Sequence, residues 1–285
     1  ALIRKIPISF SASVGQIVQD RTLPFRVAAK VIPGDVNLSY SGAISNLRET
    51  PMLKGKFSLD GKNLNTFVSG VANGMVLPSA LGRAFSVQAT IAASQSQIDI
   101  PDLAFSLDET KGTGKVSAVL GPTPGADVML TINKVDLDKL LVAPPQPTPA
   151  PPKEPTSSVA PPASSSHLSI EPNASQSADT PFSLATLPEN LVSSLSLSIE
   201  ALKFRGKAIR QANLTAELAG REVTLSQLSA LLPGNTDLAM FGFISQKGRA
   251  PSFDGTVDMA TNDLRGMLDW LGTDASHIAQ DRLRK

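Results

Sequence analysis

Apolar and polar residues alternate along most of this 285-residue chain. In the stretch 85–91, FSVQATI, every second residue is apolar and the residues between them are Ser, Gln and Thr. A period of two places alternate side chains on opposite faces of a β-strand, so each run predicts a strand with one apolar face and one polar face. Such strands are typical of antiparallel sheet. The same alternation recurs in the runs 25–31, 103–107, 128–132, 214–218 and 253–259.

Dipeptides that favour turns separate these runs. They are Pro33-Gly34, Asp60-Gly61, Gly121-Pro122, Ala219-Gly220 and Pro233-Gly234. The glycine-rich sequence KGTGKV at 111–116 also predicts a hairpin turn. It does not fit a phosphate-binding loop, because Glu109 and Val116 stand where that loop needs Gly and Ser or Thr.

The spacing changes from strand-like to helix-like at three places. Apolar residues follow Asn63, Asp136 and Asp263 at intervals of three and four, as in LRGMLDWL at 264–271. Asn and Asp are good helix N-caps, because their side-chain oxygens accept hydrogen bonds from the free N–H groups of the first turn. The helix after Asn63 is predicted to be the longest, with an apolar stripe as far as residue 76. A short amphipathic helix needs an apolar surface, so we expect each one to fold back over the edge or mouth of the sheet.

The chain also contains an internal repeat. A shift of 200 residues superposes two segments without a gap, and a looser third copy runs from Gly114 to Leu141. The matches include Pro33-Gly34 with Pro233-Gly234, Gly42 with Gly242, Gly55 with Gly255, and Asn63-Leu64 with Asp263-Leu264. We therefore predict a mainly β protein in which repeated units form one extended, twisted, mainly antiparallel sheet with short amphipathic helices.

Residues 143–181 interrupt this pattern with a tract dominated by Pro and Ser. A segment with so few large apolar side chains cannot offset its ordering entropy, so it is predicted to be disordered. We expect it to be an insertion into a continuous sheet, flanked by β-repeat regions at 1–142 and 182–285. A plain tether is favoured over a PxxP motif that binds a partner.

Composition argues against catalysis and against nucleic acid binding. The net charge is +1 with no basic face, and the aromatic content is 5%, so neither phosphate contacts nor base stacking is expected. Cysteine is absent, which excludes thiolate catalysis, Cys-ligated metal and disulfides. Of the two histidines, His167 lies in the Pro/Ser tract and His277 near the end of the sequence. We expect a non-enzymatic protein without a cofactor or a metal site.

The order of several motifs resembles the AsmA family of Gram-negative bacteria. SVQATIAASQSQIDIPDLAFSLDETKGTGKVSAVL at 86–120 is similar to the family's strand–strand passage, and MLTINKVDLDKLL at 129–141 to its strand-to-helix ending. After a Pro-rich insertion, LSLSIEALKFRG at 195–206 and the segment 216–245 resemble the C-terminal AsmA-like region. The resemblance covers residues 25–142 and 182–272. It rests on the order of the motifs, since each alone is loose.

The resemblance implies a periplasmic protein that supports outer-membrane biogenesis and is anchored in the inner membrane by a helix absent from this sequence. It implies a sheet that curls into a groove and carries phospholipid acyl chains between the two membranes. The candidate groove residues are Phe85, Val87, Ile91, Leu103, Phe105, Leu107, Val128, Leu130, Ile132, Val257 and Met259.

Three alternatives to an open lipid groove stay open. The apolar face could be closed as the core of a sandwich. The repeats could be spacers in a structural or adhesive envelope protein. The chain could also be an assembly factor that presents sheet edges to outer-membrane proteins.

Overall fold

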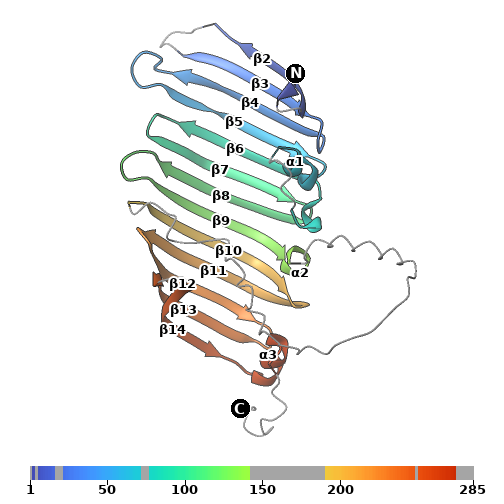
Figure 1. Ribbon diagram of the computed structural model, residues 1–285, viewed down its shortest axis with the longest axis vertical. Coiled ribbons are helices and arrows are strands. Elements are labelled where there is room, and N and C mark those ends of the chain that lie inside the picture. The colour runs from blue at the N-terminus through green and yellow to red at the C-terminus, as the bar shows by residue number, and fades with distance from the viewer. Residues whose placement is uncertain are drawn as a thin grey trace, which may run out of the picture.

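The computed structural model describes residues 2–3, 6–16, 22–71, 77–141, 190–247 and 250–273. They form one fourteen-stranded sheet in which each strand pairs with the next along the chain (Figure 1). The strands are β1 (Leu2–Ile3), β2 (Ile6–Val14), β3 (Leu23–Val31), β4 (Val36–Ser45), β5 (Met52–Gly61), β6 (Phe85–Ala93), β7 (Gln97–Leu107), β8 (Thr110–Val119), β9 (Gly125–Asp136), β10 (Val192–Phe204), β11 (Lys207–Ala219), β12 (Glu222–Leu232), β13 (Thr236–Lys247) and β14 (Ala250–Ala260). The helices are α1 (Leu64–Val71), the 3₁₀ turn η1 (Ser79–Leu81), α2 (Leu137–Leu140) and α3 (Leu264–Leu271). The predicted fold class, mainly β with short helices, is confirmed.

Pairing is antiparallel at every joint except one. Strands β9 and β10 run parallel, with Gly125 opposite Val192 and Asp136 opposite Lys203. The blocks before and after the Pro/Ser-rich tract therefore share one sheet, whereas the tract itself lies outside the described residues. The alternation of side chains could not have shown this parallel joint, because parallel and antiparallel strands have the same period of two.

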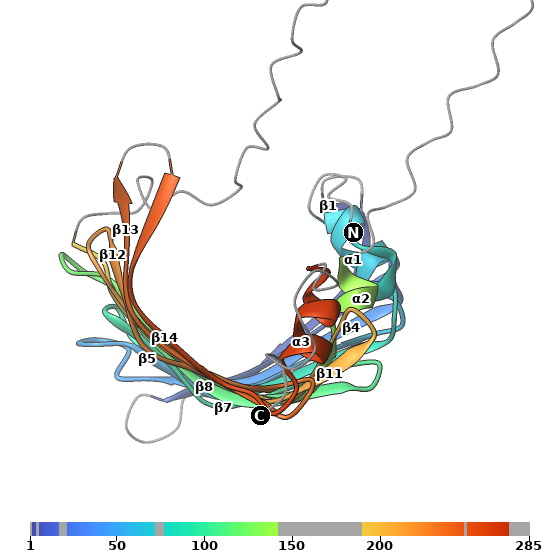
Figure 2. The ribbon, with the colours of Figure 1, turned by 90° about the horizontal axis from the view of Figure 1, so that it is seen from below.

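The sheet is bent across its strands into a trough (Figure 2). Viewed along the long axis, the strands form a curved floor with two raised rims, and α1, α2 and α3 lie along the same rim. Each of these helices directly follows a strand, namely β5, β9 or β14. Among the described residues, no helix has the length and apolar character needed to cross a lipid bilayer.

All three helices begin at a capping side chain. Asn63 Oδ1 accepts a hydrogen bond from the N–H of Thr66 at 2.9 Å. Asp136 Oδ1 accepts from Lys139 N at 3.2 Å. In the last repeat, Asp263 Oδ1 accepts from Gly266 N at 2.9 Å. These bonds satisfy N–H groups that the first turn leaves without an intrahelical partner. The helix after Asn63 is described only as far as Val71, so the rest of its predicted stripe lies outside the described residues.

Buried apolar side chains gather where the helices pack on the sheet. Beneath α1, Val36 is fully buried and Phe85 is 6% exposed. The ring of Phe67 from α1 stacks on Phe85 with 5.9 Å between the ring centroids. Beneath α3, Trp270 is 8% exposed and its Nε1–H donates to the carbonyl of Phe204 at 3.0 Å. These clusters fix the helices to the rim.

Two predicted turns are strands instead. Asp60-Gly61 forms the last two residues of β5, and Gly61 lies beneath the ring of Phe85. The KGTGKV sequence lies inside β8, and the hairpin turn before it falls at Asp108-Glu109. In both places glycine provides room for a large neighbouring side chain, so its presence did not signal a turn.

Candidate functional site

The register of the strands builds a continuous apolar row across the sheet. One residue from each of thirteen consecutive strands stands opposite the next, from β2 to β14, without a break. The row consists of Ala12, Val27, Tyr40, Phe57, Ala89, Leu103, Gly114, Leu130, Leu197, Leu214, Leu228, Met240 and Val257. With about 4.8 Å between neighbouring strands, twelve steps span about 58 Å.

The eleven predicted groove residues all lie on the face of this row. Val87 is opposite Phe105, and Phe85 is opposite Leu107. Leu103, Leu130 and Val257 belong to the row itself. The other predicted residues join it through equivalent cross-strand pairs: Ile91 with Gly55, Val128 with Val116, Ile132 with Gly112, and Met259 with Leu238. The structure thus brings together residues that the alternation had identified one strand at a time.

A β-bulge in β7 keeps its apolar side chains on one face, although they change from even-numbered to odd-numbered residues along the strand. Between β6 and β7, Thr90 pairs with Asp102 while Ala92 pairs with Asp99, so β7 contains one extra residue. The extra residue falls at Pro101, which cannot donate a hydrogen bond to a neighbouring strand. As a result Ile100, an even-numbered residue, joins the face of the odd-numbered residues that follow it.

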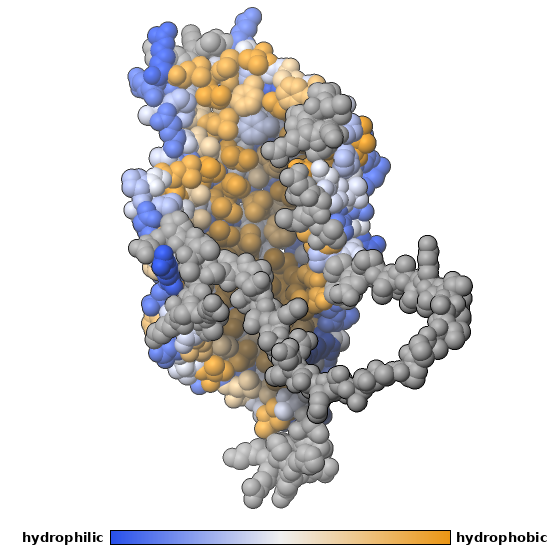
Figure 3. Space-filling view, viewed as in Figure 1, coloured by the Kyte–Doolittle hydropathy of each residue, from blue (hydrophilic) through white to orange (hydrophobic). Residues whose placement is uncertain are grey.

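The opposite face is mostly polar, although Met129, Phe241 and Phe243 are exposed on it. One of its rows includes Ser39, Ser58 and Gln88. Hydroxyl pairs link neighbouring strands there, with Ser39 Oγ 2.7 Å from Ser58 Oγ and Ser86 Oγ 2.9 Å from Ser106 Oγ. A shallow depression of about 690 Å³ lies mostly among the side chains of this face, which include Lys56, Asp102 and Lys115. Because the apolar face lines the inside of the trough (Figure 3), this is the outer, convex surface.

The apolar face is the concave one, and it is open. Figure 3 looks into the trough and shows a band of apolar side chains along its length. Near its two ends, Phe10 is 64% exposed and Val257 is 51% exposed. Only eight apolar side chains in the described part of the chain are buried. No second sheet covers this face among the described residues, so it is not the core of a sandwich.

Glycines let large side chains lie flat on the trough floor. The ring of Phe105 lies directly over Gly112, and Leu130 lies over Gly114. Tyr40 lies over the paired glycines Gly42 and Gly55. In the equivalent place of the last repeat, Phe253 lies over Gly255. A side chain at Gly112 would push the Phe105 ring up into the trough, whereas at Gly42, Gly114 and Gly255 it would also strike a backbone oxygen of the neighbouring strand. This role was not predicted from the sequence, although glycines two residues apart in a strand are a usable signal.

The floor around Tyr40 is apolar and aromatic. The Tyr40 ring stacks on Phe25, with 5.2 Å between the ring centroids. Its buried hydroxyl has no hydrogen-bond partner among the described residues. Burial raises the pKa of this hydroxyl above its usual value. A buried hydroxyl without a partner is costly, so this position is less favourable for Tyr than an otherwise similar Phe would be.

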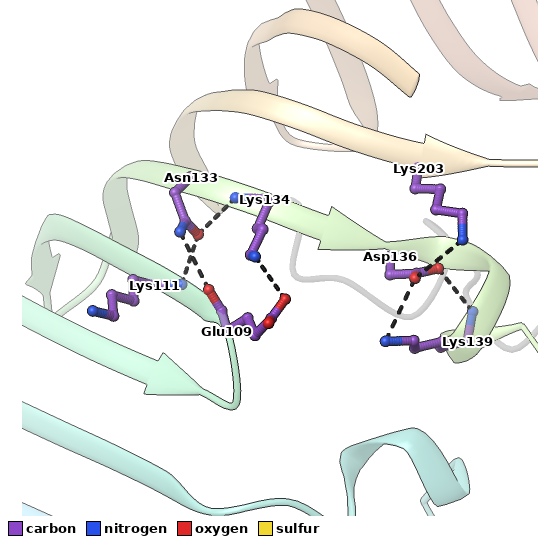
Figure 4. A network of polar contacts seen from close by, with 7 residues as sticks. All are labelled: Glu109, Lys111, Asn133, Lys134, Asp136, Lys139 and Lys203. Atoms are coloured by element: carbon purple, nitrogen blue, oxygen red, sulfur yellow. Dashed lines mark hydrogen bonds and ion pairs between the residues drawn. The ribbon is translucent and has the colours of Figure 1, made fainter. Parts of the chain in front are cut away.

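The helical rim adjoins a second, smaller cavity of about 310 Å³. It lies between η1, the β7–β8 turn, α2 and the ends of β9 and β10, and its lining includes Leu107 of the trough. Figure 4 shows the charged residues beside it. Lys134 Nζ is 2.6 Å from Glu109 Oε2, whereas Lys139 Nζ and Lys203 Nζ are each 3.7 Å from the same Asp136 oxygen.

Carboxyl groups on this rim are held in their charged form. The pKa of Glu109 is lowered by its hydrogen bond and charge interaction with Lys134. Burial acts to raise the pKa of Asp136, but the N–H of Lys139 and the charges of Lys203 and Lys139 outweigh it and lower the pKa. At the far end of the rim, hydrogen bonds from Lys62 and Lys30 lower the pKa of Asp35 to about 2.

The described side chains include no cluster of three or more His, Asp or Glu that could hold a metal ion. The arrangement combines a long apolar concave face, a mostly polar convex face and a charged rim. Comparisons with protein families, with characterised proteins and with solved structures gave no match to this chain.

Proposed function

We propose that this chain is an AsmA-like, non-enzymatic protein of the periplasm that supports outer-membrane biogenesis by carrying phospholipid. In this proposal, acyl chains lie in the trough and move along it between the inner and outer membranes. The observation that carries the proposal is the unbroken apolar row of thirteen residues on an open concave face.

The trough can shield acyl chains without binding them at one place. Each buried methylene group contributes about 0.8 kcal/mol, so a chain lying on the apolar floor gains much of the energy it has in a bilayer. A lipid that moves by one strand spacing leaves one apolar residue and meets another of the same kind. The energy therefore changes little along the row, which suits transport better than storage.

The one-sided shape also suits an amphipathic cargo. A closed cavity would have to bury the polar head group, which is costly unless every polar atom finds a partner. An open trough leaves the head group at the mouth, in contact with water and with the rim. The apolar row has no reactive group to harm the cargo, because the Tyr40 hydroxyl is the one polar side-chain group among its thirteen residues.

Site-specific photocrosslinking tests the proposal. A photoreactive amino acid at Phe105 faces the trough, and one at the adjacent Ala104 faces the convex side as a matched control. We expect phospholipid to be crosslinked at position 105 and not at position 104 when the protein is isolated from cells. Absence of lipid at both positions, or equal amounts at both, would refute the proposal.

One observation favours a second candidate, a factor that assembles outer-membrane proteins. Strand β14 is an edge strand, and residues 252–260 are all exposed. Free edges of this kind can pair with a strand of another protein. The same experiment separates the two functions, because an assembly factor would crosslink protein from positions on β14 and no lipid from position 105.

A further inference from the structure

The rim cavity combines apolar and charged groups in a way that the trough does not. Its apolar lining includes Leu81, Leu107 and Leu140, and Leu107 is also opposite Phe85 on the trough face. The cavity thus adjoins, through Leu107, the face that we propose for acyl chains. A ligand that occupied both would need an apolar part and a polar part.

Two of its lysines are weakly held. Lys139 and Lys203 approach one oxygen of Asp136, from α2 and from the end of β10 (Figure 4). Both nitrogen–oxygen distances are 3.7 Å, which is beyond hydrogen-bonding range. The side chains remain 64% and 51% exposed. Two ammonium groups sharing one carboxylate leave a local positive charge and several unused N–H donors.

A carboxylate on the other side of the cavity is free. Asp108 stands in the β7–β8 turn beside Glu109, and its side chain makes no hydrogen bond or ion pair with any described residue. Glu109, in contrast, is paired with Lys134 at 2.6 Å. The cavity lining therefore has three acidic and three basic side chains, with the available positive charge on α2 and β10 and the available negative charge on the β7–β8 turn.

We propose that this cavity binds the zwitterionic head group of a phospholipid that carries a phosphate and a primary amine. The phosphate accepts hydrogen bonds from Lys139 and Lys203, and the ammonium group lies against Asp108. The acyl chains pass Leu107 into the trough, so this inference rests on the proposed function. A separated pair of charges in a cavity of zero net charge complements a zwitterion better than a simple anion.

The test compares three lipids that have the same two acyl chains. In each lipid, one of these chains bears a fluorophore. The lipids are a phosphatidylethanolamine, a phosphatidylglycerol and a diacylglycerol, and glycerophosphoethanolamine serves as the soluble head group. K139Q/K203Q should weaken binding of both phospholipids about tenfold and leave diacylglycerol binding unchanged. D108N should weaken only phosphatidylethanolamine, by about threefold.

These variants should fold normally. The lysines are exposed, and Asp108 has a φ of 54°, a left-handed conformation that Asn also adopts readily. The control K54Q/K56Q removes two exposed positive charges from the strand β5, away from the rim. It should leave all three affinities unchanged.

The outcomes distinguish the two proposals. If the wild-type protein binds none of the lipids, the trough proposal itself fails. If all lipids bind equally in every variant, the trough stands and the head-group site is wrong. An equal loss in K54Q/K56Q would show general charge attraction and overturn the site. Glycerophosphoethanolamine binding as tightly as the whole phosphatidylethanolamine would show that the acyl chains add nothing to binding, which would refute the trough proposal.

Discussion

Replacing Leu130 by Asp places a charge in the middle of the apolar row. Leu130 is half-buried, lies over Gly114 and stands opposite Leu197 on β10. The change removes part of a leucine's burial, worth about 1–2 kcal/mol. Because the trough is open, water can still reach the new carboxylate, and the larger cost of an unpaired charge in a closed core does not apply.

The expected effect on stability is therefore modest. A loss of about 1–2 kcal/mol lowers the melting temperature of a chain of this size by about 3–6 °C. Thr131→Asp is the matched control, because Thr131 is the next residue on the same strand and is exposed on the convex face. Any cost of Asp in a strand is common to both variants, so their difference isolates the apolar face.

Lipid binding should respond much more than stability. Position 105 on β7 is two strands away from Leu130 on β9, so its photocrosslinking reports on cargo in this part of the trough. We expect Leu130→Asp to reduce lipid crosslinking at 105 about tenfold, whereas Thr131→Asp leaves it unchanged. Complete unfolding of Leu130→Asp would refute the open trough, and unchanged crosslinking in a folded variant would refute the lipid pathway.

Three further changes test other parts of the structure. Gly112→Val should lift the Phe105 ring into the trough and weaken lipid binding, whereas Thr113→Val, on the convex face, should not; lipid fluorescence titration measures both. Asp263→Ala should lower the free energy of unfolding by about 1 kcal/mol in urea denaturation, because the Gly266 N–H loses its partner, whereas Asp263→Asn should retain most of it. Asp35 has a folded pKa of about 2, below its usual 3.8, so its ion pairs stabilise the protein above about pH 4 and are lost as the pH falls toward 2. Melting curves of Asp35→Asn should converge with those of the wild type over this range, and a constant difference would contradict the assignment.

The sequence was informative where a feature depends on a few neighbouring residues. Period-two runs identify strands, and the residues before each helical pattern identify the capping side chains, because both signals are local. The glycines of β8 were misassigned for the same reason. Whether a glycine forms a turn or makes room for Phe105 depends on the register of β7, which is set by the bulge at Pro101.

The charged rim could not be found from sequence. Lys203 and Asp136 are 67 residues apart and meet only because β9 and β10 pair in parallel with these two residues opposite each other. No local pattern at either residue marks that pairing. The trough as a continuous surface also needs the full register, since each run of sequence shows only the apolar face of one strand.

The parallel pairing of β9 with β10 determines on which rim α3 lies. Each antiparallel step reverses the strand, so a strand ends on the same rim as an earlier one only after an even number of reversals. From β5 to β9 there are four reversals, which place α1 and α2 on one rim. From β9 to β14 there are five steps, and α3 would reach the opposite rim if all five were reversals.

The single parallel step reduces five reversals to four and returns α3 to the helical rim. That step requires the chain to return from one rim to the other before β10 begins. The twelve residues of β9 span about 41 Å at about 3.4 Å per residue. At most about 3.6 Å is gained per extended residue, so a connection shorter than about 12 residues cannot make the return. The segment between β9 and β10 can therefore lose most of its length without moving α3, whereas replacing it by a tight hairpin would reverse β10 and transfer the last helix to the other rim.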